Sequence, residues 1–356
     1  MCIACNRTKR FSIAGFSFPN RMDPVTHALA SVALARAGIE KTSRMALPIL
    51  LVSGLIADVD WITRMGSPSL FLNGYRTATH SIAGTGFLIL IVSAAFWYRG
   101  KINPRGAVSF RNAVIICTIG AVAHLLLDLL NDYGVKLWWP VSSRWYAWDL
   151  AAMVDWWIIF FLLAGLFLPW LFALIHEEIG SRPRQRGRQR GAIAGIFMVL
   201  CFIAGRGMAH ERALAILNSR VYHAQTPLRV AAFPESTTPL AWSGVIETDN
   251  AISTIDVSLF PGAPFDADQA RVHFKPEDSA VLSSAAQSRS AKLFLNFARF
   301  PLASIGPQEG VTQVMLRDLR FALDAARWQN VIAVIKLNDQ NAVTDEHLEF
   351  NSAAGN

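Results

Sequence analysis

Residues 112–131 read NAVIICTIGAVAHLLLDLLN, and this stretch decides the fold. It is apolar over the length of about 20 residues that a helix needs to cross the hydrocarbon core of a bilayer. Two ionisable side chains, His124 and Asp128, interrupt it near its C-terminal end. Ionisable groups inside membrane segments are costly and usually serve a function. The stretch therefore predicts a membrane helix that carries part of a functional site.

The composition of the whole chain agrees with a membrane protein. Of its 356 residues, 53% are hydrophobic, and the mean hydropathy is +0.32, high for a soluble protein. Further apolar runs precede and follow the quoted stretch, at residues 25–38, 46–62, 80–98, 150–175 and 191–209. We predict an α-helical integral membrane bundle of about six segments over residues 22–210.

The basic residues predict how this bundle is oriented. Twelve Lys and Arg side chains lie in the loops after the first, third and fifth apolar runs, and four lie in the alternate loops. Because basic loops stay in the cytoplasm, the alternate loops and everything after residue 210 are predicted to lie outside. Despite the net charge of +7 we expect no nucleic-acid partner, since five arginines share one such loop: Arg182, Arg184, Arg186, Arg188 and Arg190.

The two ends of the chain differ from the bundle. Residues 1–21 are predicted to be an extension without fixed structure, and their single C-x-x-C pair, Cys2 and Cys5, is weak evidence for a metal or redox site. After residue 220, short β-branched and aromatic segments predict a small, mostly β extracytoplasmic domain over residues 220–350. The expected strands are 228–233, 242–247, 252–259, 292–297, 311–316 and 330–337, with 261–290 as loop.

Costly side chains gather at one end of the predicted membrane segments. Under the topology above, each of them falls at the outer end of its segment: Asp23, His27, Asp58, Asp60, His80, His124, Asp128, Asp149 and Asp155. Charges without a common purpose would be divided between the two faces. The sequence therefore predicts a shared polar site on the outer side of the membrane.

The residue types at this site are those that bind divalent metals. His124 and Asp128 are four residues apart, so both project from one face of a helix. Imidazole and carboxylate suit Zn²⁺, and also Mn²⁺ or Fe²⁺. Thr79 before His80, and Thr26 before His27, are expected to cap helix starts, which would favour an anionic substrate.

Plainer interpretations stand beside this one. A single buried histidine is more often a hydrogen-bonded core residue than a ligand. Asp149 and Asp155 are interpreted either as partners of Arg144 or as part of the site. The tryptophans near the predicted segment ends fit an interfacial aromatic belt. The conjunction of three histidines with at least three aspartates favours metal over a structural polar network.

At these residues the sequence resembles the YdjM-like family of membrane-bound, metal-dependent hydrolases. The matching stretches are MDPVTHA (22–28), GLIADVD (54–60), RTATHS (76–81), HLLLD (124–128) and residues 134–142. The resemblance implies a divalent-metal site built from His27, Asp58, His80, His124 and Asp128, in a protein of the bacterial inner membrane. The family is also distantly similar to the zinc phospholipase C and P1 nuclease group, which implies phosphoester hydrolysis. Two departures are Tyr75, where the family commonly has His, and Asn131, where Thr is frequent.

From these observations we expect a membrane-embedded metal hydrolase. Asp60 would act as general base and Arg76 would hold the substrate anion. Because the site lies near the membrane surface, the expected partners are membrane lipids, and the substrate is a lipid or another amphiphile. The alternative is a non-enzymatic protein that binds or transports metal ions or protons, which a flux assay in proteoliposomes would detect. A third interpretation makes the β domain a partner-binding module on a membrane anchor.

Overall fold

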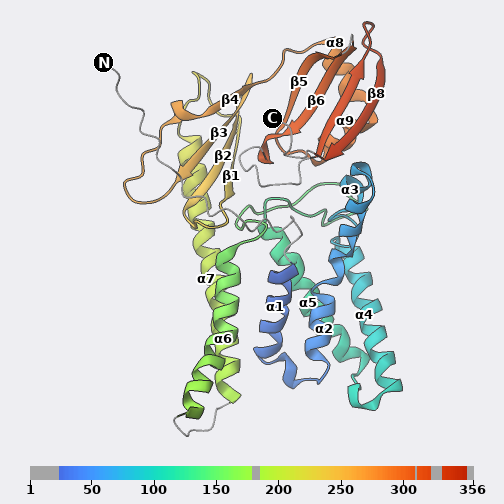
Figure 1. Ribbon diagram of the computed structural model, residues 1–356, viewed down its shortest axis with the longest axis vertical. Helices are drawn as coiled ribbons and strands as arrows, with labels where there is room; N and C mark the ends of the chain where they lie inside the picture. Colours follow the sequence, from blue (N-terminus) through green and yellow to red (C-terminus); the bar gives the residue numbers. More distant parts are fainter. Residues whose placement is uncertain (1–23, 179–184, 309–310, 322–330, 351–356) are drawn as a thin grey trace.

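The computed structural model describes residues 24–178, 185–308, 311–321 and 331–350. The predicted extension, with Cys2 and Cys5, lies outside these residues. A bundle of helices carries two β-sheets at one of its ends (Figure 1). The helices of the bundle are α1 (Pro24–Arg36), α2 (Ala46–Ser53), α3 (Pro68–Gly74), α4 (Ile82–Ile102), α5 (Phe110–Leu130), α6 (Trp156–Glu178) and α7 (Gln185–Asn218), with 3-10 turns η1 (Ile39–Lys41), η2 (Ile56–Met65) and η3 (Pro104–Gly106).

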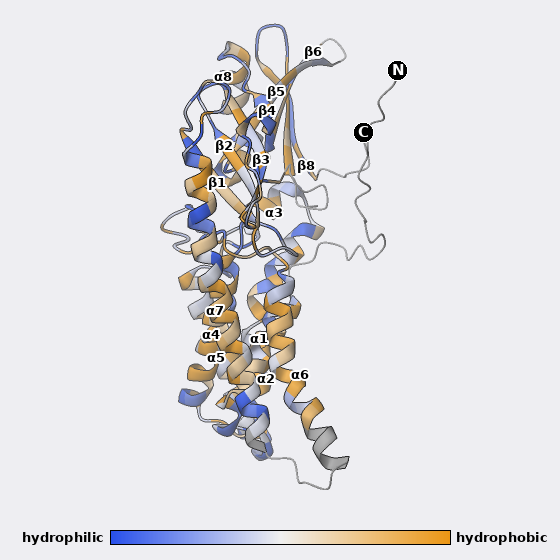
Figure 2. Ribbon diagram, turned by 90° about the vertical axis from the view of Figure 1, so that its left-hand side faces the viewer, coloured by the Kyte–Doolittle hydropathy of each residue, from blue (hydrophilic) through white to orange (hydrophobic). Residues whose placement is uncertain are grey.

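Four helical stretches of the described residues are long and apolar enough to cross a membrane. They are Ala46–Met65, Ile82–Ile102, Phe110–Leu130 and Gly187–Asn218, and a shorter apolar helix covers Trp156–Phe172. Figure 2 shows apolar residues along the bundle helices and hydrophilic residues at the end away from the sheets. Large side chains such as Phe87, Leu90 and Phe197 point outward, as expected where a surface faces lipid rather than water.

The second apolar run is not one continuous α-helix. It forms α2, which ends at Gly54, and then the ten-residue 3-10 helix η2. Asp58 and Asp60 both lie on η2, within the candidate span. The tighter winding of a 3-10 helix turns these two side chains toward different partners, as described below.

Serine side chains cap the starts of several helices. Ser67, Ser81 and Ser109 each accept a hydrogen bond from the backbone N–H three residues later, which satisfies a donor that the helix leaves free. The prediction that Thr79 caps the helix after His80 was wrong, because Ser81 takes that position. Thr26 was also misplaced, since α1 begins at Pro24 and Thr26 lies inside its first turn.

Helix α5 places His124 and Asp128 on its buried face. Ala113, Cys117, Gly120, His124 and Asp128 lie at spacings of three or four residues, and all five are buried, as expected for one face of a helix. A Cβ atom on Gly120 would lie 2.2 Å from Ser53 Oγ. The close packing of α5 against α2 therefore depends on this glycine, and it brings His124 against the end of α2.

The C-terminal part contains two antiparallel sheets with sequential strand order. The first holds β1 (Arg229–Pro234), β2 (Ala241–Glu247), β3 (Ala251–Ser258) and β4 (Arg271–Phe274), with η4 (Ala267–Gln269) before β4; the second holds β5 (Pro301–Gln308), β6 (Val311–Asp318), β7 (Val331–Leu337) and β8 (Val343–Phe350), with η5 (Leu319–Phe321) after β6. A connection between the sheets forms α8 (Ala280–Gln287) and α9 (Arg289–Phe297). This agrees with the predicted mostly β character, while the side of the membrane stays a prediction.

Two predictions for this part were wrong. Residues 292–297, predicted as a strand, lie in α9, where Ala291, Phe294 and Phe297 are buried at three-residue spacing and Ser288 caps the helix. Residues 261–290, predicted as loop, contain β4 and α8. In both places packing against the second sheet or pairing with β3 selects a structure that local composition does not distinguish.

The second sheet packs directly on the bundle. One apolar core joins Phe71 and Leu72 of α3, Tyr75 and Tyr133 with residues of α9 and strands β6–β8. In Figure 1, α3 lies immediately below this sheet. The segments that carry the predicted site are therefore covered by the C-terminal part.

Candidate metal centre

The structure brings all seven predicted site residues together at the end of the bundle that faces the sheets (Figure 1). They come from four separate segments of the chain. These are His27 in the first turns of α1, Asp58 and Asp60 on η2, Arg76 and His80 between α3 and α4, and His124 and Asp128 on α5. Side chains more than 100 positions apart in the sequence thus form one cluster.

Four atoms of this cluster lie at the corners of a small polyhedron. His80 Nε2 and His124 Nε2 are 3.1 Å apart, and Asp128 Oδ2 lies 3.0 and 3.2 Å from them. Asp58 Oδ1 lies 3.6 Å from His80 Nε2 and 3.4 Å from His124 Nε2. Ligands of a tetrahedral zinc ion, at their usual bond lengths, are separated by about 3.3–3.6 Å. The four atoms are therefore spaced almost as the ligands of one such ion would be.

Hydrogen bonds at the far side of each imidazole orient the two histidines. His124 Nδ1 lies 2.8 Å from the carbonyl oxygen of Gly54, and His80 Nδ1 lies 2.9 Å from Asp60 Oδ2. Both partners can only accept, so both Nδ1 atoms carry the proton. In neutral imidazoles the lone pairs are then on the two Nε2 atoms, which face each other. Two facing lone pairs repel unless a metal ion, or a proton on one of the two nitrogens, lies between them. Imidazoles oriented in this way are typical of metal-binding histidines.

Several carboxylate oxygens of the cluster accept no hydrogen bond. Neither side-chain oxygen of Asp58 accepts a hydrogen bond, nor does Asp128 Oδ2, although all three atoms are buried. Buried polar atoms normally have a partner, and unpaired buried charges are strongly unfavourable. The cluster also contains three carboxylates, those of Asp58, Asp60 and Asp128, and a single guanidinium. A bound divalent cation would balance this excess of negative charge.

His27 is a fifth candidate ligand with a different geometry. Its Nε2 lies 3.5 Å from Asp128 Oδ1, the oxygen that faces away from the polyhedron, and its ring stacks on that of His124 at 4.1 Å. His27, Asp58, His124 and Asp128 each offer one ligand atom within 4.8 Å of the others. His80, which this set of four omits, makes the shorter contacts given above. We therefore regard the polyhedron as the primary set and His27 as an additional ligand.

The side chain of Arg76 contacts the cluster through Asp128 Oδ1, the oxygen that faces away from the polyhedron. Its Nη2 donates to Asp128 Oδ1 at 2.6 Å and its Nη1 donates to Asn131 Oδ1 at 2.8 Å. Its backbone N–H donates to Asp60 Oδ2 at 2.8 Å, and its φ of 51° is in the left-handed region, which is unusual for a residue with a side chain. Both Nη atoms of Arg76 are therefore engaged inside the protein.

The sequence did not reveal several partners of the ligands. The backbone carbonyl of Gly54 orients His124. Every residue has such a carbonyl, so the residue type does not reveal this contact. Thr79 Oγ1 donates to Asp60 Oδ2 at 2.6 Å, where a helix cap was predicted. Asn131 stands three residues after Asp128, on the same side of the chain as the α5 site residues. That spacing, together with the departure from the family at this position, is the signal by which it could have been found.

Asp149 and Asp155 follow neither of their two interpretations, since they lie outside the cluster and their partners are not Arg144. Asp149 forms a two-point ion pair with Arg299 of the C-terminal part, at 2.7 and 2.8 Å. Asp155 accepts from the N–H groups of Trp157 and Ile158 and so caps α6. Tertiary contacts gave both carboxylates partners that their sequence neighbours do not supply.

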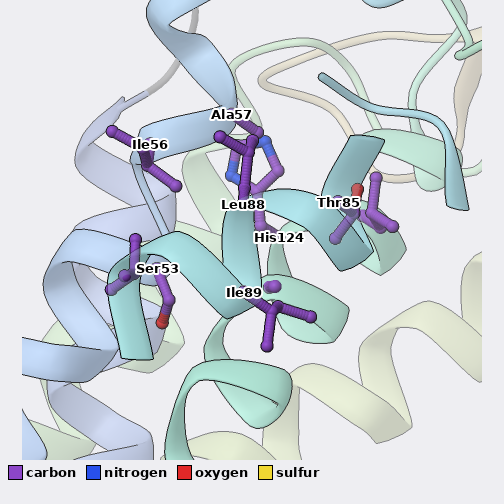
Figure 3. Close-up of a pocket in the computed structure, with 10 residues that line it drawn as sticks. Ser53, Ile56, Ala57, Thr85, Leu88, Ile89 and His124 are labelled. Carbon is purple, nitrogen blue, oxygen red and sulfur yellow. The ribbon is translucent and has the colours of Figure 1, made fainter. Parts of the chain in front are cut away.

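Below His124 the surroundings become apolar. A small cavity of about 10 Å³, room for about one water molecule, lies between α2, η2, α4 and α5 (Figure 3). Its lining is His124 together with Ser53, Ile56, Ala57, Thr85, Leu88, Ile89, Val92, Ala121 and Leu125. His124 is the only ionisable group in this lining, so the polar cluster ends at it on this side.

Fold and site together define a membrane protein with a buried group of histidines and aspartates that could hold a metal ion. The model of the family described as YdjM inner membrane protein matches residues 22–213, and the chain belongs to this family. The chain is also 25% identical over 153 residues to the uncharacterized protein YfhP of Bacillus subtilis (strain 168). That match covers 41% of this chain and 45% of YfhP, less than half the length of either protein. No solved structure matches the chain.

Proposed function

We propose that this protein is a membrane-bound, metal-dependent hydrolase. The observation that carries the proposal is the set of four atoms, Asp58 Oδ1, His80 Nε2, His124 Nε2 and Asp128 Oδ2, whose separations approach those of a tetrahedral ligand set. Both side-chain oxygens of Asp58 and Oδ2 of Asp128 accept no hydrogen bond, which supports the proposal. Zinc is the metal that this geometry and donor set favour, with Mn²⁺ or Fe²⁺ as alternatives.

In the proposed reaction Asp58, His80, His124 and Asp128 would hold the metal, with His27 as a candidate fifth ligand. Because four protein ligands fill a tetrahedral site, a water or substrate oxygen would bind in place of one of them. A divalent ion at such a site polarises a phosphoryl or acyl oxygen and lowers the pKa of a water ligand toward about 7. Asp58 is the most exposed of the four ligands, at 12%. Substrate therefore approaches on the side of η2.

Two roles expected from the sequence change in this proposal. Asp60 was expected to be the general base, but its Oδ2 accepts from Thr79 Oγ1 and the Arg76 N–H and faces His80 Nδ1. We assign it the task of orienting His80. Arg76, expected to hold the substrate anion, has both Nη atoms on Asp128 and Asn131. We assign it the task of holding Asp128.

The substrate class follows from the surroundings of the site. Val59, Ile62 and Met65 of η2 are exposed and apolar, and they flank Asp58 in a candidate membrane span. A phosphoester or related group on a lipid-like amphiphile would bring its apolar part against this surface. From the distribution of basic loops we infer that the site and the C-terminal sheets lie on the extracytoplasmic face of a bacterial inner membrane, with six membrane segments.

The test is metal analysis combined with hydrolysis. The full chain, purified in mild detergent, is expected to contain about one equivalent of transition metal by elemental analysis and to hydrolyse phosphodiester or phospholipid substrates. A strong chelator should remove both properties, and zinc should restore them. Protein that carries no metal would contradict the proposal. Metal without hydrolysis, accompanied by metal flux in proteoliposomes, would support the transport alternative instead.

Asp60→Asn tests the orienting role of Asp60. The variant keeps the shape of the side chain and removes the charge that faces His80 Nδ1, so metal affinity is expected to fall by about 10-fold. Competition with a coloured chelator measures it. Asp155→Asn is the matched control, because Asp155 is another buried carboxylate that caps α6 outside the site. Equal metal affinities for the two variants would show that Asp60 has no such role.

A further inference from the structure

The C-terminal sheets extend beyond the part of the chain that matches the family. The family model ends at residue 213, and the first strand begins at Arg229. Yet one residue from the second sheet region reaches the backbone beside the candidate metal centre. Arg320, in η5, donates from Nη1 to the carbonyl oxygen of Asp132 at 3.0 Å and lies 3.4 Å from that of Tyr133.

Arg320 is built into this position. It is 1% exposed and pairs with Asp318, with Nη2 at 3.0 Å and Nε at 3.2 Å from Oδ2 of the carboxylate. Its guanidinium also lies over the rings of Phe297 and Phe321. A planar guanidinium with a fixed counter-ion presents its remaining donors in one direction, which a flexible lysine cannot do. The Arg320 side chain thus holds the turn that follows α5 in one position.

The other side of the same turn is held by Asn131. Asn131 Oδ1 accepts from the backbone N–H groups of Tyr133 and Gly134, at 3.1 and 3.3 Å, and from Arg76 Nη1 at 2.8 Å. Arg76 in turn holds Oδ1 of Asp128. Continuous contacts therefore run from Arg320 through the turn to Asn131, Arg76 and Asp128.

We propose that Arg320 is a positioning residue of the metal centre, through which the C-terminal part fixes Asp128 with Oδ2 toward the metal. The proposal rests on the metal centre of the proposed function. When Arg320 holds the turn, Asn131 and Arg76 each have one low-energy position, and the ligand is in place before the metal binds. Without the contacts of Arg320, metal binding must itself order the turn, and this ordering reduces the free energy of metal binding.

The experiment measures zinc affinity in the full-length protein by chelator competition, beside thermal unfolding. Arg320→Met is expected to weaken zinc binding by about 10-fold, as outer contacts of metal ligands commonly do. Arg320→Lys keeps the charge opposite Asp318 and provides a milder variant that folds; it is expected to show a smaller loss in the same direction. Lys336→Met is the control, because Lys336 lies in β7 of the second sheet with a half-exposed partner, Asp345, and zinc affinity should not change.

A double-mutant comparison separates positioning from general destabilisation. Asn131→Ala is expected to weaken zinc binding by a similar factor, and the variant with both Arg320→Met and Asn131→Ala should lose little more than either alone, because the contacts act in series. Folded Arg320→Met and Arg320→Lys proteins that bind zinc like the wild type would overturn the proposal, as would losses for the pair that multiply. A wild-type protein without zinc would instead refute the proposed function, and this inference with it.

Discussion

Alanine in place of His124 is expected to reduce zinc affinity by more than about 100-fold and hydrolysis to background. Residues that merely orient a ligand commonly contribute 10–100-fold to metal affinity, and a direct ligand contributes more. His124 Nε2 touches all three other atoms of the polyhedron, at 3.1–3.4 Å. The same loss is expected for Asp128→Ala. Elemental analysis after purification and a zinc titration measure the effect.

Two further histidine variants provide comparisons for the loss of zinc affinity expected in His124→Ala. His27→Ala should weaken zinc binding less than His124→Ala, because His27 Nε2 faces Asp128 Oδ1 outside the four primary atoms. His347→Ala, on the exposed surface of β8, should behave like the wild type. If His27→Ala were the more damaging variant, His27 would belong to the primary set and His80 or Asp58 would not.

Replacing Arg76 with methionine is expected to lower the free energy of unfolding of the metal-free protein by about 3–5 kcal/mol, the usual cost of leaving a buried charge without its partner. Arg76 is 2% and Asp128 is 1% exposed, and their contact is 2.6 Å. Around Asp128 the other groups that can carry a positive charge are the imidazoles of His27, His80 and His124; no second guanidinium or ammonium contacts it among the described residues. Denaturant titration in detergent, with chelator present, measures the change.

The matched control is an ion pair of similar length at the surface. Arg229 and Glu247 lie 2.7 Å apart, but Arg229 is half exposed, so Arg229→Met should cost no more than about 1 kcal/mol. Adding Asp128→Asn to Arg76→Met removes the orphaned charge and should recover most of the lost stability. A loss from Arg76→Met as small as that from Arg229→Met would mean that Asp128 does not depend on Arg76.

Much of the helical part could be predicted from local patterns. Apolar length marked α4 and α5, and the spacing of His124 and Asp128 placed both on one helix face. Six of the nine costly side chains lie together in the structure, with Arg76 beside them: His27, Asp58, Asp60, His80, His124 and Asp128. This grouping could be predicted because charges are rare in such segments and their positions coincide once the loops are oriented, while the roles of the residues stay predictions. The break at Gly54 and the 3-10 form of η2 could not be predicted, since the apolar run continues through them.

Predictions failed where partners come from distant parts of the chain. Asp149 was interpreted either as a partner of the nearby Arg144 or as part of the site, and it instead binds Arg299, 150 positions away. Residues 292–297 have β-like composition, yet their apolar residues meet the second sheet at helical spacing. Asp60 was predicted to be the general base and Arg76 to hold the substrate anion. Their polar atoms face other site residues, which the sequence does not show, so the proposed function assigns them positioning roles.

The sequence by itself determined that residues 112–131 form an apolar helix with a histidine and an aspartate on one face. This follows from residue type and spacing alone, which are local properties. Only the tertiary structure showed which side-chain atoms of His124 and Asp128 face the other candidate ligands. It bound His124 Nδ1 to the Gly54 carbonyl and Asp128 Oδ1 to Arg76, and it left His124 Nε2 and Asp128 Oδ2 facing Asp58 and His80. A hydrogen bond to one atom of a side chain sets the chemistry of the other, and those bonds join segments that the sequence keeps far apart.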